Sequence, residues 1–389
     1  MTVNIQQRLG TDGKMKKRMP LKKPSPKKTF PTFKEMGKHL AKNQIEIPAQ
    51  FMAVILAGYF LGIPLFEKFL FVSNQRPSGL FEKSGWDLTF LLFYVAFFTA
   101  ARAIAINHIL IPYAIRKNVP RNKHERFAEQ IWSFVYYSIS FTFGMCVMYG
   151  SPWWFDSSYF WRFYPVTESS MALKYYYLLQ FAFWVQQIFV LQIEAPRKDY
   201  RELVAHHIAT IILIGFSYLF NFLRIGNAVF VCMDLPDALL ALAKALNYVS
   251  PGPLCNGTFV LMLISWMYTR VYVYGYIVLS TLIEPDLYVA EFKLDPLQGH
   301  FYPYILKYLM FLTMAFLYAL ILFWTAMIFK VLYKMAFSTE VRDVRSDDEG
   351  EGEDEDEEVE GKTTGRIVGS KKQSITTTRR TIRATKTSK

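Results

Sequence analysis

The chain alternates between long apolar segments and short polar connections from residue 48 to residue 335. The apolar segments fall near 48–72, 88–114, 128–150, 171–193, 203–222, 228–249, 256–283 and 303–335. Each is long enough to cross the hydrocarbon core of a bilayer, where a helix satisfies all of its own backbone groups. The pattern predicts an all-α fold, a polytopic transmembrane helical bundle of about eight spans.

Charged residues gather at the two ends of the chain. Residues 14–42 carry eleven Lys or Arg and one acid, residues 347–360 carry eleven Asp or Glu and no base, and the chain is basic again after 362. Because such segments cannot bury a core, we expect disordered tails at 1–46 and 337–389. Between them we predict a first transmembrane anchor at 47–73, uncleaved because no signal-peptide pattern precedes it, and a membrane domain at 87–336.

The connections also predict an orientation. Eight spans place both ends of the chain on one side, and the basic connections at 116–126 and 197–201 fall on that same side. The positive-inside rule makes this side, with both termini, cytosolic. The net charge of +12 lies in these tails and connections, which favours contact with anionic lipid over nucleic-acid binding.

Several polar features admit two interpretations. The aromatic-rich connection 151–165 fits an interfacial belt or a lid over a lipid entrance. Ser346, followed by three acidic residues, suits an acid-directed kinase, but the segment also fits a solvated spacer. The sequon at Asn256 lies on the predicted cytosolic side, so we expect it to be unmodified. The three cysteines form no CxxC pair and fit apolar packing.

Ionisable residues inside the predicted spans are the candidates for chemistry, because their burial in hydrocarbon is costly. They are Arg102, His206, His207, Asp234, Asp237, Lys244 and Arg270. Arg270 and Lys244 fit either a role in the site or structural pairing.

His206, His207, Asp234 and Asp237 form the strongest constellation. Adjacent histidines point about 100° apart on a helix, so at most one should touch a reacting atom, whereas Asp234 and Asp237 share a face. A short turn near 222–227 should pack the two spans antiparallel. A carboxylate beside an imidazole equips it as a general base or a nucleophile, although buried structural ion pairs remain the alternative. Counted from that turn, the His and Asp pairs differ in depth by about 6 Å.

Other chemistries fit these residues less well. A di-iron hydroxylase needs more clustered histidines than the six present. A zinc site has suitable ligand types, but adjacent histidines on one helix suit one metal poorly, so we expect no metal. Cys232 has neither a neighbouring His nor a basic flank that would make it a thiol nucleophile.

The motif around these residues resembles that of ceramide synthases. It comprises 197–210 (RKDYRELVAHHIAT) and 233–237 (MDLPD), with 183–187 (FWVQQ) upstream and 244–248 (KALNY) downstream. The surrounding spans resemble the TRAM–Lag1–CLN8 (TLC) domain, and the tails are most similar to those of fungal members. The resemblance implies acyl-CoA-dependent N-acylation of a sphingoid base, with no separate cofactor, in the endoplasmic reticulum membrane.

The resemblance also implies site residues and partners. The essential residues carry over to His206, His207, Asp234 and Asp237, and residues 284–302 correspond to the region linked to acyl length. Very long acyl chains, a small single-span accessory subunit, and a homodimer or a heterodimer with a paralogous catalytic subunit are implied as well.

The physical pattern fits acyl transfer. Arg197, Lys198 and Arg201 lie just before the histidines, where they could meet the phosphates of CoA. We expect a His oriented by Asp234 or Asp237 to act as general base, or to be acylated first in a ping-pong route. The alternatives are another type of membrane acyltransferase and a non-catalytic, lipid-sensing or translocation-associated member of the same domain family, which would not need this constellation.

Overall fold

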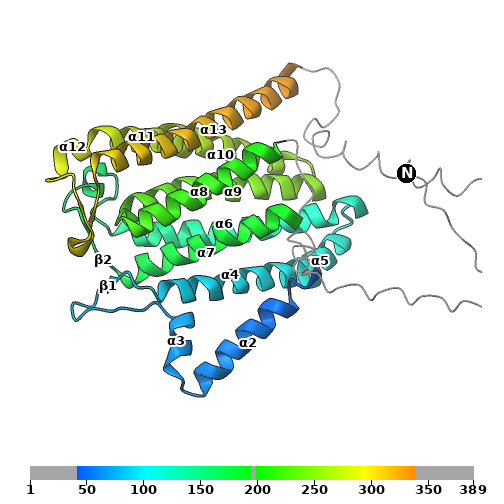
Figure 1. Ribbon diagram of the computed structural model, residues 1–389. Coiled ribbons are helices and arrows are strands. Elements are labelled where there is room, and N and C mark those ends of the chain that lie inside the picture. The colour runs from blue at the N-terminus through cyan, green and yellow to red at the C-terminus, as the bar shows by residue number, and fades with distance from the viewer. Residues whose placement is uncertain (1–41, 194–198, 338–389) are drawn as a thin grey trace, which may run out of the picture.

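The computed structural model describes residues 42–193 and 199–337, which form a bundle of helices that run up and down one axis (Figure 1). The predicted tails lie outside the described residues, except for their innermost positions. The longer helices and helical passes are α2 (Glu46–Phe60), α4 (Asp87–Ile104) continued by η1 (Ala105–Leu110) and α5 (Ile111–Arg116), α6 (His124–Tyr149), α7 (Met171–Ile193), α8 (Tyr200–Leu219), α9 (Leu223–Val249), α10 (Pro253–Ser265) continued by η4 (Trp266–Val273) and α11 (Tyr274–Ile283), and α13 (Tyr304–Phe337).

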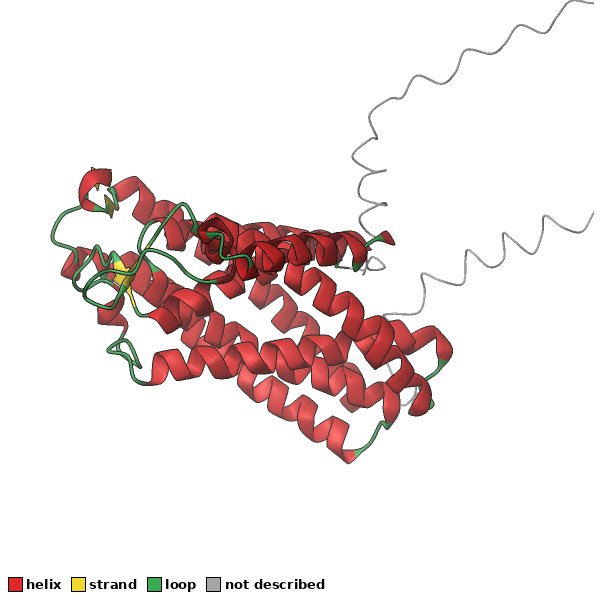
Figure 2. Ribbon diagram, turned by 90° about the horizontal axis from the view of Figure 1, so that it is seen from below, coloured by secondary structure: helices red, strands yellow, loops and turns green. Residues whose placement is uncertain are grey.

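Short elements occupy the connections. Two two-stranded antiparallel ladders pair β1 (Phe81–Glu82) with β2 (Glu168–Ser169) and β3 (Leu294–Asp295) with β4 (His300–Phe301). Both lie at the end of the bundle opposite to the two ends of the described chain (Figures 1 and 2). The remaining short helices are α3 (Pro64–Leu70), η2 (Arg121–Lys123), η3 (Ser157–Phe160), α12 (Pro285–Tyr288) and η5 (Pro296–Gln298).

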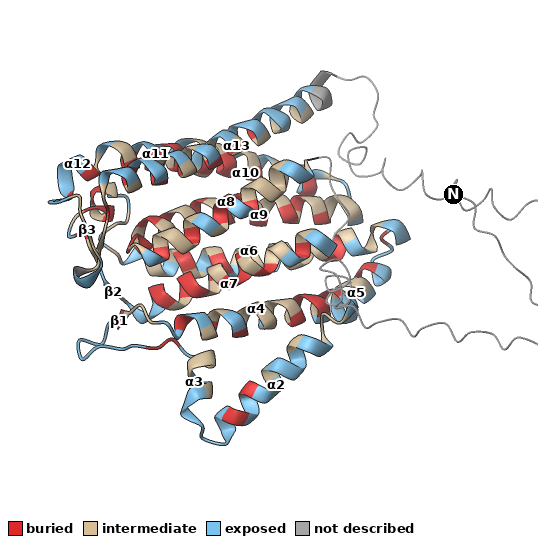
Figure 3. Ribbon diagram, in the orientation of Figure 1, coloured by how far each residue is buried: buried red, intermediate tan, exposed pale blue. Residues whose placement is uncertain are grey.

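The predicted all-α membrane fold is confirmed at this level. Among the described residues, four helical passes are long and apolar enough to cross a membrane: 87–116, 121–149, 200–219 and 304–333. Large apolar side chains such as Ile139, Leu261 and Ile264 are more than half exposed on the outer faces (Figure 3). Exposed apolar surface on this scale marks contact with lipid or with another protein.

The central helices α7 and α9 are long but more polar. They have 23 and 27 residues, and their buried positions include Lys174, Gln180, Gln186 and Asp234. Because α9 packs closely against α6, and α7 against α4, these polar side chains lie inside the bundle. Helix α9 therefore carries Asp234 inside the bundle, whereas the histidines lie on α8, one of the four apolar passes.

The predicted first anchor, 47–73, is not one straight helix. Helix α2 ends at Phe60, Gly62 adopts a φ of 73°, and Pro64 begins α3. A left-handed glycine ends a helix, and proline is favoured in the first turn of the next one. Both pieces pack against α4, so this segment forms a bent pair at the side of the bundle (Figure 1).

The aromatic connection 151–165 is mainly a packed cap, rather than only an interfacial belt. Trp161 is fully buried and Tyr164 nearly so, and both rings pack against Phe222 at the turn between α8 and α9. Phe155 and Phe163 remain 76% exposed, as expected of rings at an interface. The cap closes the end of the bundle that lies away from the histidines.

Candidate active site

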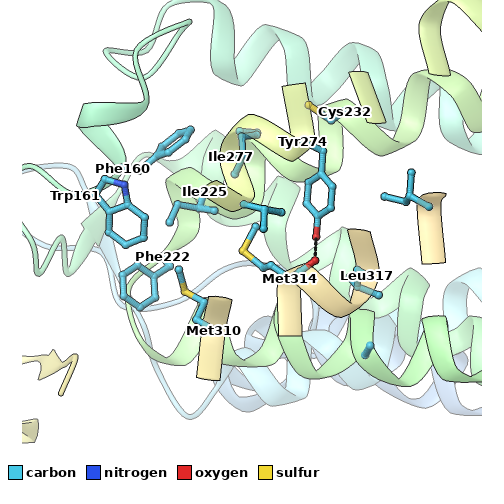
Figure 4. Packing of buried hydrophobic residues seen from close by; sticks show 14 of the residues in the cluster. Phe160, Trp161, Phe222, Ile225, Cys232, Tyr274, Ile277, Met310, Met314 and Leu317 are labelled. Atoms are coloured by element: carbon cyan, nitrogen blue, oxygen red, sulfur yellow. Dashed lines mark hydrogen bonds between the residues drawn. The ribbon is translucent and has the colours of Figure 1, made fainter. Parts of the chain in front are cut away.

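An apolar cavity lies between α7, α8, α9, α13 and the η4–α11 pass. The charged and imidazole side chains of its lining, His206, Asp234, Asp237 and Arg270, lie toward one end. Along α8 the lining continues from His206 to Ser217, about 16 Å at the helical rise, and ends at Phe222. Figure 4 shows part of its apolar wall, where Met310 of α13 lies close to Phe222, Met314 lies between Ile225 and Tyr274, and Leu317 lies beyond Tyr274.

The two histidines occupy different positions, as predicted for neighbours on a helix. His206 lines the cavity, with its ring against the edges of Trp184 and Trp324 at 5.6 and 5.4 Å between centroids. Its buried Nδ1 has no hydrogen-bond partner in the described structure. Trp324 is itself held by a 3.1 Å hydrogen bond from its indole nitrogen to Asp199.

His207 is buried and turned toward its own helix. Its Nδ1 lies 2.8 Å from the Leu203 carbonyl oxygen. Because a carbonyl only accepts, Nδ1 carries the proton, and the neutral ring then has its basic lone pair on Nε2. His207 does not line the cavity, so His206 is the histidine placed to meet a substrate.

Asp234 is held by neutral donors from two other helices. Ser140 of α6 donates to its Oδ2 at 2.7 Å, and Gln180 of α7 donates to the same oxygen at 2.8 Å. Tyr136 donates in turn to the Gln180 Oε1 at 3.0 Å, which fixes the amide orientation. A buried carboxylate satisfied in this way has one defined position.

Asp237 pairs with Arg270 across the cavity wall. The Arg270 Nη2 lies 2.6 Å from Oδ2 of Asp237 and donates to the Met233 carbonyl at 2.9 Å. The guanidinium also stacks 4.3 Å from the Trp266 ring centroid, while its buried Nε has no partner in the described structure. Arg270 lies in the π-helical segment η4; such segments are frequent at functional sites.

The two carboxylates contact Ser140, Gln180 and Arg270, and both line the same cavity as the His206 imidazole. The sequence interpretation searched ionisable residues only, so it missed Ser140 and Gln180. A neutral polar side chain inside an otherwise apolar span was the signal available for both.

The expected depth offset of about 6 Å is wrong, because the turn lies earlier than predicted. Leu219 ends α8 twelve residues after His207, and Leu223 begins α9 fourteen residues before Asp237. Measured along the helices from this turn, the positions of His207 and Asp237 therefore differ in depth by about 3 Å. Arg224 and Asn227, which the predicted turn near 222–227 included, lie inside α9. Arg224 donates to the Tyr159 carbonyl at 2.8 Å, and the Trp153 indole donates to Asn227 at 3.1 Å.

The predicted CoA-binding bases are only partly described. Arg201 is exposed in the first turn of α8, at the end of the helix nearer to His206. Arg197 and Lys198 lie outside the described residues, as does the predicted phosphorylation site Ser346. Within 42–193 and 199–337, no three His, Cys, Asp or Glu side chains are grouped so as to hold a metal ion.

Comparison with known proteins identifies the family. The TLC domain of the TRAM–LAG1–CLN8 family matches residues 126–330. The sphingosine N-acyltransferase lag1 of Schizosaccharomyces pombe is 37% identical over 289 residues, 74% of this chain and 74% of that protein. Ceramide synthase LAG1 of Saccharomyces cerevisiae is 36% identical over 314 residues, covering 78% and 75%. The sphingosine N-acyltransferase lac1 of S. pombe is 32% identical over 311 residues, covering 78% and 80%.

These matches define the class as membrane-embedded TLC-domain proteins. The chain belongs to the ceramide synthase family within that class, and the resemblance of its motif to this family is confirmed. Because relatives covering most of the chain are acyltransferases, the non-catalytic alternative is not supported.

Proposed function

We propose that the chain is a ceramide synthase that transfers the acyl group of a fatty acyl-CoA to the amine of a sphingoid base, dihydrosphingosine or phytosphingosine, in the cavity beside His206. The observation that carries the proposal is the composition of this cavity. His206, Asp234, Asp237 and Arg270 stand at one end, and the rest of the lining is mainly apolar. A fatty acyl thioester has its reactive carbonyl carbon at one end of an apolar hydrocarbon chain. A cavity with polar groups at one end and an apolar remainder accommodates both the carbonyl carbon and the chain.

In the direct route, the amine nitrogen attacks the thioester carbon and the carbon–sulfur bond breaks. His206 takes the proton from the amine and returns it to the departing CoA sulfur. The partnerless Nε–H of Arg270, on the wall of the same cavity, is available to the carbonyl oxygen as negative charge develops there. Asp237 holds Arg270, and Asp234 with its fixed hydrogen bonds supplies negative charge for a transient imidazolium.

In the ping-pong route, His206 itself attacks the thioester and CoA leaves before the amine arrives. The buried and partnerless Nδ1 of His206 is compatible with this route. Intact-mass measurement after incubation with acyl-CoA alone separates the two. A mass increase equal to one acyl group supports ping-pong transfer, and an unchanged mass at full occupancy supports direct attack.

The acyl chain would extend from His206 toward Phe222. Tyr302 of the predicted length-determining region 284–302 packs with centroids 4.9 Å apart against Phe222, which lines the cavity. This contact supports a role of the region in acyl-length choice. The phosphates of CoA would meet Arg197, Lys198 and Arg201 at the other end.

We further propose an eight-span topology in the endoplasmic reticulum membrane with both termini cytosolic. The described ends at residues 42 and 337 lie at one end of the bundle, beside the basic connection 116–126 (Figure 1). This charge bias supports the assignment of that end to the cytosol. A single-span accessory subunit and a homo- or heterodimeric assembly complete the proposal.

The test uses membranes from a host that lacks ceramide synthase. Membranes with the full-length chain and the accessory subunit receive acyl-CoA and dihydrosphingosine, and ceramide is measured by mass spectrometry. Ceramide above the level of empty membranes is expected. None, with the protein present in the membrane, would show that the proposed activity is wrong.

A further inference from the structure

A second chamber, with a more polar lining than the cavity beside His206, lies at the opposite end of the bundle. Its walls come from residues 80–83, the segment 166–170, the start of α7, the end of α8, and the turn to α9. It shares no lining residue with the cavity beside His206. The acyl-transfer mechanism therefore does not use it.

One of the three bases in this chamber is neutralised. Lys174 lies 2.9 Å from Asp87 and donates to the carbonyl oxygens of Ser73 and Glu82 at 2.8 and 2.5 Å. The Tyr218 hydroxyl donates to Asp87 at 2.7 Å. This buried ion pair is a structural part of the wall.

The other two bases, Lys83 and Arg224, have no such counter-ion. Lys83 donates to the Leu219 carbonyl, and Arg224 donates to the carbonyls of Tyr159 and Arg162. No described carboxylate lies within ion-pair distance of either base. Burial lowers the pKa of the Lys83 ammonium to about 8, so the group remains mostly charged at neutral pH. Glu168 is the one acidic residue among the described residues that line the chamber. Because Lys83 and Arg224 both carry positive charge, the chamber keeps a positive excess.

A buried acceptor in the same wall also lacks a partner. Asn221, at the turn between α8 and α9, donates from Nδ2 to the Gly299 carbonyl at 3.0 Å and is 6% exposed. Its Oδ1 is buried without a hydrogen bond. Buried acceptors in native proteins are nearly always satisfied, so a donor from a bound molecule is indicated. The ligand must combine anionic oxygens for the two bases with a hydroxyl or ammonium donor.

We propose that this chamber binds the phosphate group of a phospholipid headgroup, with Lys83 and Arg224 supplying the positive charge and Asn221 accepting from the headgroup's hydroxyl or ammonium. The location favours a lipid source. The chamber lies among the connecting segments at one end of the bundle, where Trp86 and Phe155 expose aromatic rings as at a membrane interface.

Native mass spectrometry of the purified full-length chain in detergent tests the proposal. The probes are dioctanoylphosphatidylglycerol, dioctanoylglycerol with the same tails but no phosphate, and inorganic phosphate. The phospholipid should bind more tightly than dioctanoylglycerol. Lys83→Gln should weaken its affinity about tenfold, the effect of losing one charge-assisted contact.

Two variants serve as controls. Lys83→Arg should retain the affinity because it keeps the charge, and Arg76→Gln should retain it because Arg76 lies in the same connection but outside the chamber, paired with Glu82. If inorganic phosphate displaces the phospholipid from wild type and fails to bind Lys83→Gln, that result would support the phosphate site, with a free phosphate ion as its source. Equal binding of dioctanoylglycerol, or equal affinities of wild type and Lys83→Gln, would overturn the proposal.

Discussion

The ion pair between Arg270 and Asp237 gives the sharpest prediction on the site. Their side chains are 8% and 24% exposed, and the closest nitrogen–oxygen distance is 2.6 Å. Replacing Arg270 by Met leaves the Asp237 carboxylate without its cation, which typically costs about 3–5 kcal/mol. The double replacement Arg270→Met with Asp237→Leu removes both charges, so it should recover stability to within about 1 kcal/mol. Ceramide formation should remain lost in both variants, because the cavity then lacks its cation.

The assay compares thermal unfolding in detergent with ceramide formation at matched protein levels. A loss of about 3–5 kcal/mol should lower the unfolding temperature of Arg270→Met by at least about 5 °C. The matched control is Arg76→Met, because Arg76 and Glu82 are also 2.6 Å apart but Arg76 is 51% exposed. Its effect should stay below about 1 kcal/mol. Ceramide formation restored in the double variant would refute the participation of this pair in acyl transfer and leave it a structural role.

Three further predictions concern single side chains. Gln180→Leu removes a hydrogen bond to the Asp234 carboxylate that is worth about 1.5–3 kcal/mol, so kcat/KM should fall at least about tenfold. An unchanged kcat/KM would show that this hydrogen bond does not matter for catalysis. Lys174→Met leaves the Asp87 carboxylate without its cation, so the unfolding temperature should fall while the remaining folded protein still forms ceramide. An unchanged unfolding temperature would contradict the structural role of this ion pair. The pKa of Lys83 is about 8 in the folded chain, against an ordinary value of 10.5. The unfolded state therefore binds more protons in that interval, and wild type should gain stability relative to Lys83→Met as pH rises from about 8 to 10.5; parallel stability curves would contradict this.

Much of the fold followed from apolar segment length. The predicted span 171–193 coincides with α7, and 228–249 ends with α9 at Val249. The prediction failed where local backbone chemistry decides. In 48–72 the glycine and proline at 62 and 64 break the helix, although the apolar run continues through them. The turn between α8 and α9 was placed too late because Arg224 was assigned to a loop. Its charge is in fact satisfied by carbonyls of the cap, contacts that are distant in sequence.

The site was predictable in part. His206, Asp234 and Asp237 do line one cavity, and the different surroundings of His206 and His207 follow from helical geometry. The partners of the aspartates were not predictable from local sequence. Gln180 precedes Asp234 by 54 residues, and Arg270 follows Asp237 by 33. Only packing of separate helices brings such pairs together, and the π-helical segment η4 occurs where Arg270 reaches the cavity.

His206 is the residue proposed to perform acyl transfer in the cavity between α8 and α9. The most direct measurement is ceramide formation by membranes from the synthase-free host that contain wild type, His206→Ala or His108→Ala at equal levels. His108 is exposed and does not line the cavity, so its variant controls for the loss of an imidazole. Ceramide is expected from wild type and His108→Ala, with a loss of at least about a hundredfold in His206→Ala. Ceramide formation by His206→Ala at the wild-type rate would contradict this role.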